Sequence, residues 1–246
     1  MKNIINDLSK IIETSVLTLV TTKKDGIHKA TCFVIYQDES FYYVLCCRHS
    51  VEKATKIDVK DASQKSYVAT IDFKSSKYDF AVLKILKDET TKFETLKLSD
   101  ANVHSGETCF LLGTQSGKPN TLGQGVFMDN IFYTKSDIGK MPDDIRKERL
   151  QNGWLLHHEG FYQYSVKNAV IVKGCGDTGN SGSPVLNSNL ELVGMIFEKA
   201  GVEIEETVMV ALSSEFIKEA WSDYTLKSKI TYEQIQNNFS EKIKKI

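Results

Sequence analysis

The sequence has little proline and no long apolar run. Its 246 residues include three prolines and no low-complexity tract, while 41% are hydrophobic and 26% are charged, which is typical of an ordered globular protein. Residues 1–20 have an apolar bias, but Asp7, Lys10 and Glu13 interrupt it before a signal-peptide core could form. No stretch is long enough to cross a bilayer. We therefore expect a protein that is neither exported nor embedded in a membrane.

An excess of charge of one sign is also missing. The 31 basic and 32 acidic residues are scattered along the chain, so nothing resembles the basic face of a nucleic-acid-binding protein, and we expect neither a nucleic-acid nor a membrane partner. The five cysteines are odd in number, and the only close pair is adjacent in sequence, a poor arrangement for a disulfide framework or a zinc site. They are Cys32, Cys46, Cys47, Cys109 and Cys175. We interpret them as buried free thiols in a reducing cytoplasm, and expect no cofactor and no bound metal.

Short β-rich runs separated by polar turns fill most of the chain. Few convincing helical patterns separate these runs, so antiparallel barrels or sandwiches are favoured over a parallel sheet. Two clusters of similar size predict two barrels, at 15–118 and 119–215. The first cluster is "SVLTLVTT", "KATCFVIYQ", "FYYVLCC", "SYVATIDF", "FAVLKIL" and "ETCFLLGT"; the second is "GQGVFMDNIFY", "GFYQYSVKNAVIV", "GSPVLN", "LELVGMIFE" and "ETVMVAL".

Helical patterns are confined to the two ends of the chain. Apolar residues at helical spacing predict a short helix within 1–14 and a helical segment over 216–246, where Thr231 and Gln234 fit a capping box. The stretch 134–153 is charged, and we interpret it as a surface loop inserted in the second barrel. The apolar positions are Ile4, Ile5, Leu8, Ile11 and Ile12 at the start, and Ile235, Phe239, Ile243 and Ile246 at the end.

The stretch "GDTGNSGSPVLN" at 176–187 sets Ser181 between Gly179 and Gly182, and Pro184 follows before an apolar run. One interpretation is a tight turn, in which the glycines supply positive φ and Pro184 starts a strand. The other is a serine nucleophile, whose hydroxyl is exposed while backbone N–H groups converge on the oxyanion that it creates. Gly179 then lets the backbone turn inward, and Gly182 lets substrate approach. The second interpretation requires a base and an orienting acid elsewhere.

A histidine and an aspartate meet that requirement. His49 follows the apolar strand in "YYVLCCRHSV", so its ring projects from a strand end. Arg48 beside it fits either a solvated arm or a substrate contact, and we favour the solvated arm. Asp79 leads an apolar strand after a polar turn in "SSKYDFAVLKI". By itself each residue is more simply explained as an ordinary surface histidine or a turn aspartate, although the position after a strand favours His49.

Together the three stretches resemble the trypsin-like serine peptidases with the chymotrypsin fold. The matching motifs are "RHSV" at 48–51, "DFAVLKI" at 79–85 and "GNSGSP" at 179–184, in the order His, Asp, Ser that this family has. The resemblance covers roughly 15–215 and is closest to the intracellular and Deg/HtrA-like branches, without a PDZ-like module. It implies an all-β fold of two six-stranded antiparallel barrels with short N-terminal and C-terminal helices.

The resemblance also implies a role for each matching residue. Ser181 would attack the scissile carbonyl, His49 would act as general base and acid, and Asp79 would orient the imidazole. The N–H groups of Gly179 and Ser181 would form the oxyanion hole. Asn180 stands where secreted relatives carry an aspartate that pairs with a freed amino terminus, so activation by N-terminal cleavage is not expected.

The resemblance places substrate-pocket candidates at Cys175, Phe197 and Glu198. Cys175 lies six residues before Ser181, where trypsin itself has the aspartate that selects basic residues, so a basic preference cannot be inferred. Phe197 begins the strand that would line the pocket, and Glu198 lies at its rim. The expected substrate is a protein or peptide, cleaved in limited, regulatory proteolysis.

Other interpretations compete with this one. A cysteine nucleophile at Cys175 lacks the spacing of the picornavirus-like proteases, and an α/β-hydrolase elbow fails because no histidine follows Ser181. The main alternative is a catalytically silent chymotrypsin-fold protein that serves as a binding module. A further hypothesis is that 134–153 orders or occludes the site in response to a regulatory protein partner.

Overall fold

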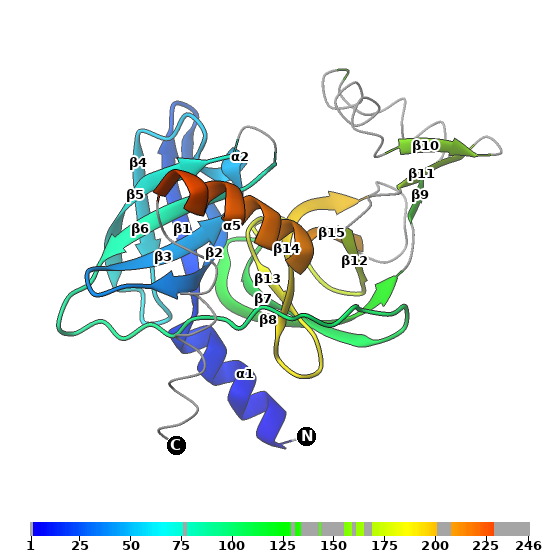
Figure 1. Cartoon of the computed structure of the whole chain (residues 1–246), viewed down its shortest axis with the longest axis horizontal. Helices are drawn as coiled ribbons and strands as arrows, with labels where there is room; N and C mark the ends of the chain where they lie inside the picture. The colour runs from blue at the N-terminus through cyan, green and yellow to red at the C-terminus, as the bar shows by residue number, and fades with distance from the viewer. Residues whose placement is uncertain are drawn as a thin grey trace.

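The chain folds into two closed antiparallel β-barrels. The computed structural model describes residues 2–75, 78–128, 131–133, 143, 155–158, 161–164, 169–200 and 208–228. The first barrel has the strand order β1-β2-β3-β6-β5-β4 and closes where β1 pairs with β4 (Figure 1). Its strands are β1 (Val16–Lys23), β2 (Gly26–Gln37), β3 (Phe41–Cys46), β4 (Lys56–Lys60), β5 (Ser66–Lys74) and β6 (Ala81–Leu86).

The second barrel also has six strands, in the order β12-β15-β14-β13-β7-β8. The expected fold class of two six-stranded antiparallel barrels is therefore confirmed. Its strands are β7 (Thr108–Gln115), β8 (Lys118–Met128), β12 (Ala169–Lys173), β13 (Pro184–Leu186), β14 (Leu192–Ala200) and β15 (Val208–Ser213).

The boundary expected at 118 is corrected by the structure, because β7 belongs to the second barrel. β7 and β8 form a hairpin whose last pair, Gln115 and Lys118, encloses Ser116 and Gly117. Both turn residues have positive φ, 48° and 77°, as in the tight turns whose twist matches that of the flanking strands. The boundary at 118 would separate two strands that this turn joins.

A separate three-stranded sheet interrupts the second barrel in sequence. Its strands are β9 (Ile131–Tyr133), β10 (Leu155–His158) and β11 (Phe161–Tyr164), in the order β10-β11-β9, and Figure 1 shows them set apart from the barrels. The run 160–172, expected as one barrel strand, is thus divided between β11 and β12. Apart from Asp143, the 134–153 loop lies outside the described residues.

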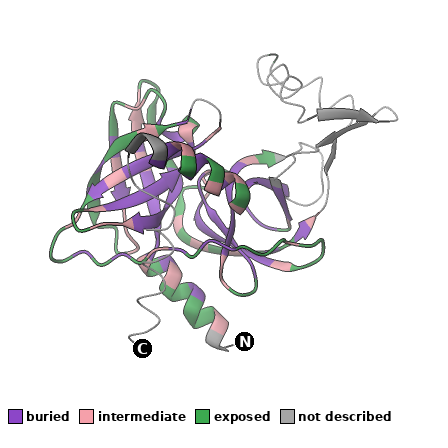
Figure 2. Cartoon of the chain, viewed as in Figure 1, coloured by how far each residue is buried: buried purple, intermediate pink, exposed green. Residues whose placement is uncertain are grey.

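Some barrel strands, β3 among them, are buried on both faces, because each barrel is filled inside and part of its outer surface packs in a further apolar cluster (Figure 2). On β3, Val44 and Cys46 point into the first barrel, whereas Leu45, and Cys47 directly after the strand, join a second apolar cluster. That second cluster, here called the interface cluster, includes residues of both barrels and of the C-terminal helix. It includes Phe33, Leu45, Cys47, Leu112, Met195, Phe197, Ile217 and Trp221.

Three described helices flank the barrels. α1 (Lys2–Thr14) buries Leu8 and Ile12 in the interface cluster, and α2 (Arg48–Val51) is a single turn after β3. α5 (Ser214–Ser228) follows the second barrel and returns to the first, where Trp221 packs edge-on against Tyr36 with the ring centroids 6.3 Å apart (Figure 1). The helical pattern expected at 231–246 lies outside the described residues. None of the described helices is long and apolar enough to span a membrane.

Candidate active site

Strand pairing brings His49 and Asp79 together. Cys46 ends β3 and pairs with Ala81, which begins β6, so the residues after one strand lie beside those before the other. Asp79 uses both carboxylate oxygens on His49: Oδ1 accepts from the backbone N–H at 2.8 Å, and Oδ2 lies 2.5 Å from ring Nδ1. The Asp79 side chain is 19% exposed and that of His49 49%. The carboxylate is thus held beneath a ring whose far edge is open to solvent.

The turn that carries Asp79 is anchored from three directions. Within the turn, Ser75 N–H donates to the carbonyl of Phe80 at 3.0 Å. Arg48 donates through Nη1 to the Ser75 carbonyl at 3.0 Å. The sequence interpretation of Arg48 as a solvated arm is therefore wrong, because its guanidinium ties the histidine turn to the aspartate turn. The third anchor is Tyr78, which contacts α5.

Tyr78, the residue before Asp79, is held by two residues of α5. Its hydroxyl donates to Glu219 Oε1 at 2.8 Å. Its ring packs edge-on against Phe216, with centroids 4.7 Å apart and an interplanar angle of 88°. No sequence motif marks these contacts, since about 140 residues separate the partners. The C-terminal helix therefore supports the loop on which Asp79 is placed.

The turn around Ser181 is closed by its own polar groups. Asn180 is only 2% exposed; its Oδ1 accepts from Asp177 N–H at 2.7 Å, and its Nδ2 donates to Ser183 Oγ at 3.2 Å. Gly179 and Gly182 have φ of +91° and +84°, which non-glycine residues rarely adopt. Asn180 thus finds its partners inside the turn.

The backbone N–H groups of this turn fall into two sets. Those of Asn180, Gly182 and Ser183 donate to backbone carbonyls. Those of Gly179 and Ser181 have no acceptor within the part of the chain that the structure describes. These are the two groups expected to form the oxyanion hole, and both remain available to a ligand.

Thr31 on β2 connects the nucleophile turn to the first barrel. Its N–H donates to the Ser181 carbonyl at 2.9 Å, and its Oγ1 donates to the Gly179 carbonyl at 3.1 Å. The same Oγ1 accepts from Thr114 N–H of β7 at 2.8 Å. A Cβ built on Gly182 would lie 2.0 Å from the Thr31 carbonyl oxygen. The missing side chain of Gly182 therefore allows β2 of the first barrel to approach the turn. The sequence interpretation had assigned this space to substrate.

The Ser181 turn also lies against the chain that leads to His49. Gly182 N–H donates to the Ile196 carbonyl at 2.7 Å, and the Cys47 thiol donates to the same oxygen at 3.2 Å. The His49 and Asp79 pair and the Ser181 turn thus meet at the seam between the barrels. Among the described residues, the His49 ring makes no hydrogen bond to Ser181.

The three pocket candidates have different surroundings. Cys175 is buried in the second-barrel core, and its Cβ would lie 2.8 Å from a Cβ built on Gly123. Phe197 belongs to the interface cluster, at a bulge in β14. Glu198 is half-buried and pairs with Val210 of β15. Their role in substrate selection stays a prediction.

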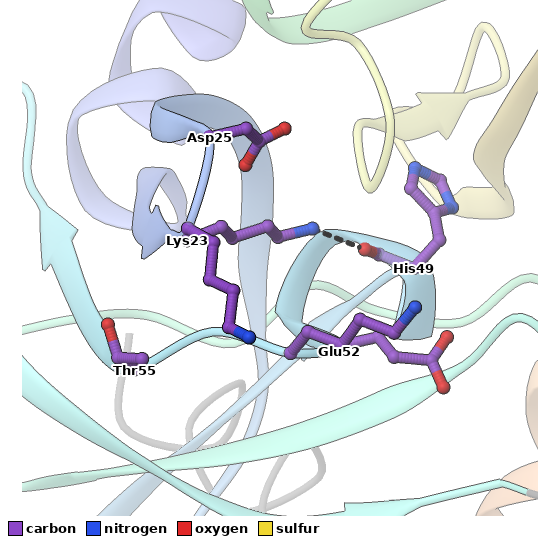
Figure 3. A pocket seen from close by; sticks show the side chains of 7 residues that line it. Lys23, Asp25, His49, Glu52 and Thr55 are labelled. Carbon is purple, nitrogen blue, oxygen red and sulfur yellow. Dashed lines mark hydrogen bonds between the residues drawn. The ribbon is translucent and has the colours of Figure 1, made fainter.

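A cavity of about 680 Å³ lies beside His49, and no sequence motif marked it. Figure 3 shows the His49 ring turned away from Lys23 and Glu52, while Lys23 Nζ donates to the His49 carbonyl at 2.9 Å. The end of β1 therefore supports the backbone of the predicted base. The lining residues are Lys23, Lys24, Asp25, His49, Glu52, Lys53 and Thr55.

Ionisable groups around the turn respond to burial and to hydrogen bonds. Burial raises the pKa of the Cys46 and Cys47 thiols, so both are protonated near neutral pH. Asp177 is at the surface, where Ser116 at 2.7 Å and Lys199 at 3.0 Å lower its pKa to about 2. The start of the nucleophile turn is thus fixed by an ionised carboxylate.

Comparison with protein families identifies one domain. The family described as trypsin-like peptidase domain matches residues 30–195, which span β2 to β14 and include the three predicted catalytic positions. No curated protein sequence matches the chain.

Solved structures share the fold at low sequence identity. The active form of the Rv3671c protease from M. tuberculosis has a TM-score of 0.64 and 18% identity, over 87% of this chain and 82% of its own. The serine endoprotease from Yersinia pestis has a TM-score of 0.61 and 15% identity, over 89% of this chain and 65% of its own. An HtrA-type protease with a tripeptide has a TM-score of 0.61 and 16% identity, over 88% of this chain and 62% of its own.

Proposed function

Because the chain belongs to the trypsin-like peptidase family, and is a serine endopeptidase by that membership, we propose that Ser181, His49 and Asp79 are its catalytic residues. The observation that carries the proposal is that His49 contacts both carboxylate oxygens of Asp79. Its backbone N–H donates to Oδ1, and its ring Nδ1 is hydrogen-bonded to Oδ2. With its proton held on Nδ1, the imidazole presents an unprotonated Nε2. That nitrogen is the base that a serine nucleophile needs.

The chemistry follows from these positions. His49 Nε2 takes the proton of Ser181 Oγ as that oxygen attacks the scissile carbonyl, and Asp79 stabilises the imidazolium that results. The proton then passes to the leaving amine, and the acyl-enzyme is released by a water molecule that His49 activates in the same way. A partly exposed ring above a mostly buried carboxylate suits this exchange.

The oxyanion of each tetrahedral intermediate would be bound by Gly179 and Ser181. Their N–H groups have no acceptor among the described residues, whereas the intervening N–H of Asn180 is bonded to Asp177. Loss of one such donor typically costs about 10²–10³ in rate. Internal closure of the turn by Asn180 supports a site that forms without N-terminal cleavage.

The proposed role is limited cleavage of protein substrates in a reducing compartment, the cytoplasm. Five free and buried thiols suit such a compartment. The segment 134–153 is the proposed point of control by a protein partner, since it is charged and inserted in the second barrel. If deletion of 134–153 changes neither basal nor stimulated turnover, this control is absent.

A fluorophosphonate probe tests the catalytic assignment without knowledge of the substrate. We expect covalent labelling at Ser181, located by peptide mapping, and its loss in Ser181→Ala and His49→Ala. Ser188→Ala is the matched control, because Ser188 is an exposed serine of the following turn and should label normally. Absence of labelling in a folded protein, purified or in lysate, would favour the alternative of a silent binding module.

A further inference from the structure

A thiol lies beside the predicted His–Asp pair. The Cys47 Sγ, a ring nitrogen of His49 and a carboxylate oxygen of Asp79 all lie within 4.8 Å of one another. Cys47, the residue after β3, is fully buried in the interface cluster, and its thiol donates to the Ile196 carbonyl at 3.2 Å. The thiol is therefore held in place close to the pair.

These three groups are ligands that zinc prefers. Zinc binds thiolate sulfur at about 2.3 Å and imidazole nitrogen or carboxylate oxygen at about 2.0–2.2 Å, usually in a tetrahedron. Ligand atoms of such a tetrahedron lie roughly 3.5 Å apart. The Nδ1–Oδ2 contact of 2.5 Å would therefore open by about 1 Å, and the thiol would move towards the pair by a similar amount at most. Because half of the His49 side chain is exposed, a fourth position is open to water. No other described group of three histidine, cysteine or acidic residues has this proximity.

We propose that Cys47, His49 and Asp79 form a zinc site whose occupation inhibits the peptidase. The binding follows from the cluster itself, while the inhibition rests on the proposed catalytic roles of His49 and Asp79. Magnesium and calcium are not expected to act in this way, since they prefer oxygen ligands.

Inhibition follows from where the ring proton must go. Zinc binds the lone pair of His49 Nδ1, so the ring proton moves to Nε2, and an Nε2–H cannot accept the proton of Ser181. The Cys47 thiol loses its proton to solvent as the zinc–sulfur bond forms. Asp79 exchanges its contact with Nδ1 for the metal. One proton is released and no electrons are transferred.

Cobalt binding tests the site independently of catalysis. Added to the Ser181→Ala protein, Co²⁺ should give a near-ultraviolet thiolate-to-cobalt absorption band and the visible bands of a tetrahedral ion, and Zn²⁺ should abolish both. Cys47→Ala and Cys47→Ser should remove the ultraviolet band, and either variant that keeps the native circular dichroism suffices. Cys46→Ala is the matched control, because the preceding thiol is equally buried but points into the first barrel.

Inhibition is then measured on the chain that retains Ser181. Zinc should slow fluorophosphonate labelling at least tenfold, whereas labelling of Cys47→Ser, measured against its own rate without zinc, should not slow. Absence of the cobalt band, or equal zinc sensitivity of Cys47→Ser, would overturn the inference. A protein that labels but binds no cobalt contradicts only the zinc site. A protein that shows the band but never labels supports the site and contradicts the catalytic assignment.

Discussion

Replacement of Gly182 by alanine is expected to disrupt the contact between the two barrels. The added Cβ would lie 2.0 Å from the Thr31 carbonyl oxygen and 3.1 Å from its carbonyl carbon. Both of these are backbone atoms of β2, which cannot move aside as a flexible side chain can. The neighbouring bond from Thr31 N–H to the Ser181 carbonyl would be strained by the same movement.

The magnitude follows from three contributions. Left-handed backbone costs a residue with a Cβ about 1–2 kcal/mol, and Gly182 has φ of +84°. Overpacking of a tight contact costs about 1–3 kcal/mol, and loss of the Thr31–Ser181 hydrogen bond about 0.5–1.5 kcal/mol. We therefore expect the free energy of unfolding to fall by about 3–6 kcal/mol, a large fraction of the stability of a typical protein.

Urea unfolding followed by tryptophan fluorescence measures this loss, since Trp221 is buried in the interface cluster. Gly106→Ala is the matched control: Gly106 has φ of +86°, but a Cβ there meets nothing within 4 Å. The control should lose only the backbone cost of about 1–2 kcal/mol. If the free energy of unfolding falls no more in Gly182→Ala than in Gly106→Ala, the close approach of the barrels at Thr31 does not limit the space at Gly182.

Three further outcomes follow from contacts around the site. Tyr78→Phe removes the hydrogen bond to Glu219, so the turn that carries Asp79 should be held less firmly. The kcat for a peptide substrate should then fall roughly 2–10-fold with KM unchanged. A change confined to KM would contradict a positioning role. Asn180→Ala leaves Asp177 N–H and Ser183 Oγ without their partner, and should lower the free energy of unfolding by about 1–3 kcal/mol, which thermal unfolding would show and an unchanged Tm would refute. The pKa of Asp177 is depressed to about 2, so its stabilising contribution is present above about pH 4 and lost as the pH falls towards 2. Because the group is exposed, this contribution is below about 1 kcal/mol. Asp177→Asn should therefore reduce the fall of Tm between pH 4 and pH 2, and an unchanged dependence of Tm on pH would show that Asp177 contributes nothing.

Local patterns in the sequence predicted the strands and the turn, because these depend on neighbouring residues. "GDTGNSGSPVLN" predicted a glycine-dependent turn before a strand, and Gly179 and Gly182 do have positive φ ahead of Pro184. The assignment of β7 to its barrel could not be predicted in the same way, because the pattern of a strand does not identify the strand that pairs with it.

The site depends on tertiary contacts that no motif encodes. The proximity of His49 and Asp79 results from the register of Cys46 with Ala81, and the support for Asp79 from α5 joins distant parts of the chain. Cys46 ends a strand that is buried on both faces, and Cys47 follows it. Because the residues of this stretch are apolar on both faces, the sequence does not show that the two side chains pack in different apolar clusters. This is why the adjacent pair gave no indication of a metal ligand.

The contacts of Thr31 have a consequence for biosynthesis. The residue leaves the ribosome about 150 positions ahead of Ser181, yet the two are joined by a hydrogen bond. A nascent chain that has completed only its first barrel therefore lacks any part of the nucleophile turn, and a second barrel that has not docked lacks the donor that holds it. Proteolytic competence should thus arise only after the second barrel has been synthesised and has docked on the first, so that a nascent chain with one barrel is not yet a peptidase.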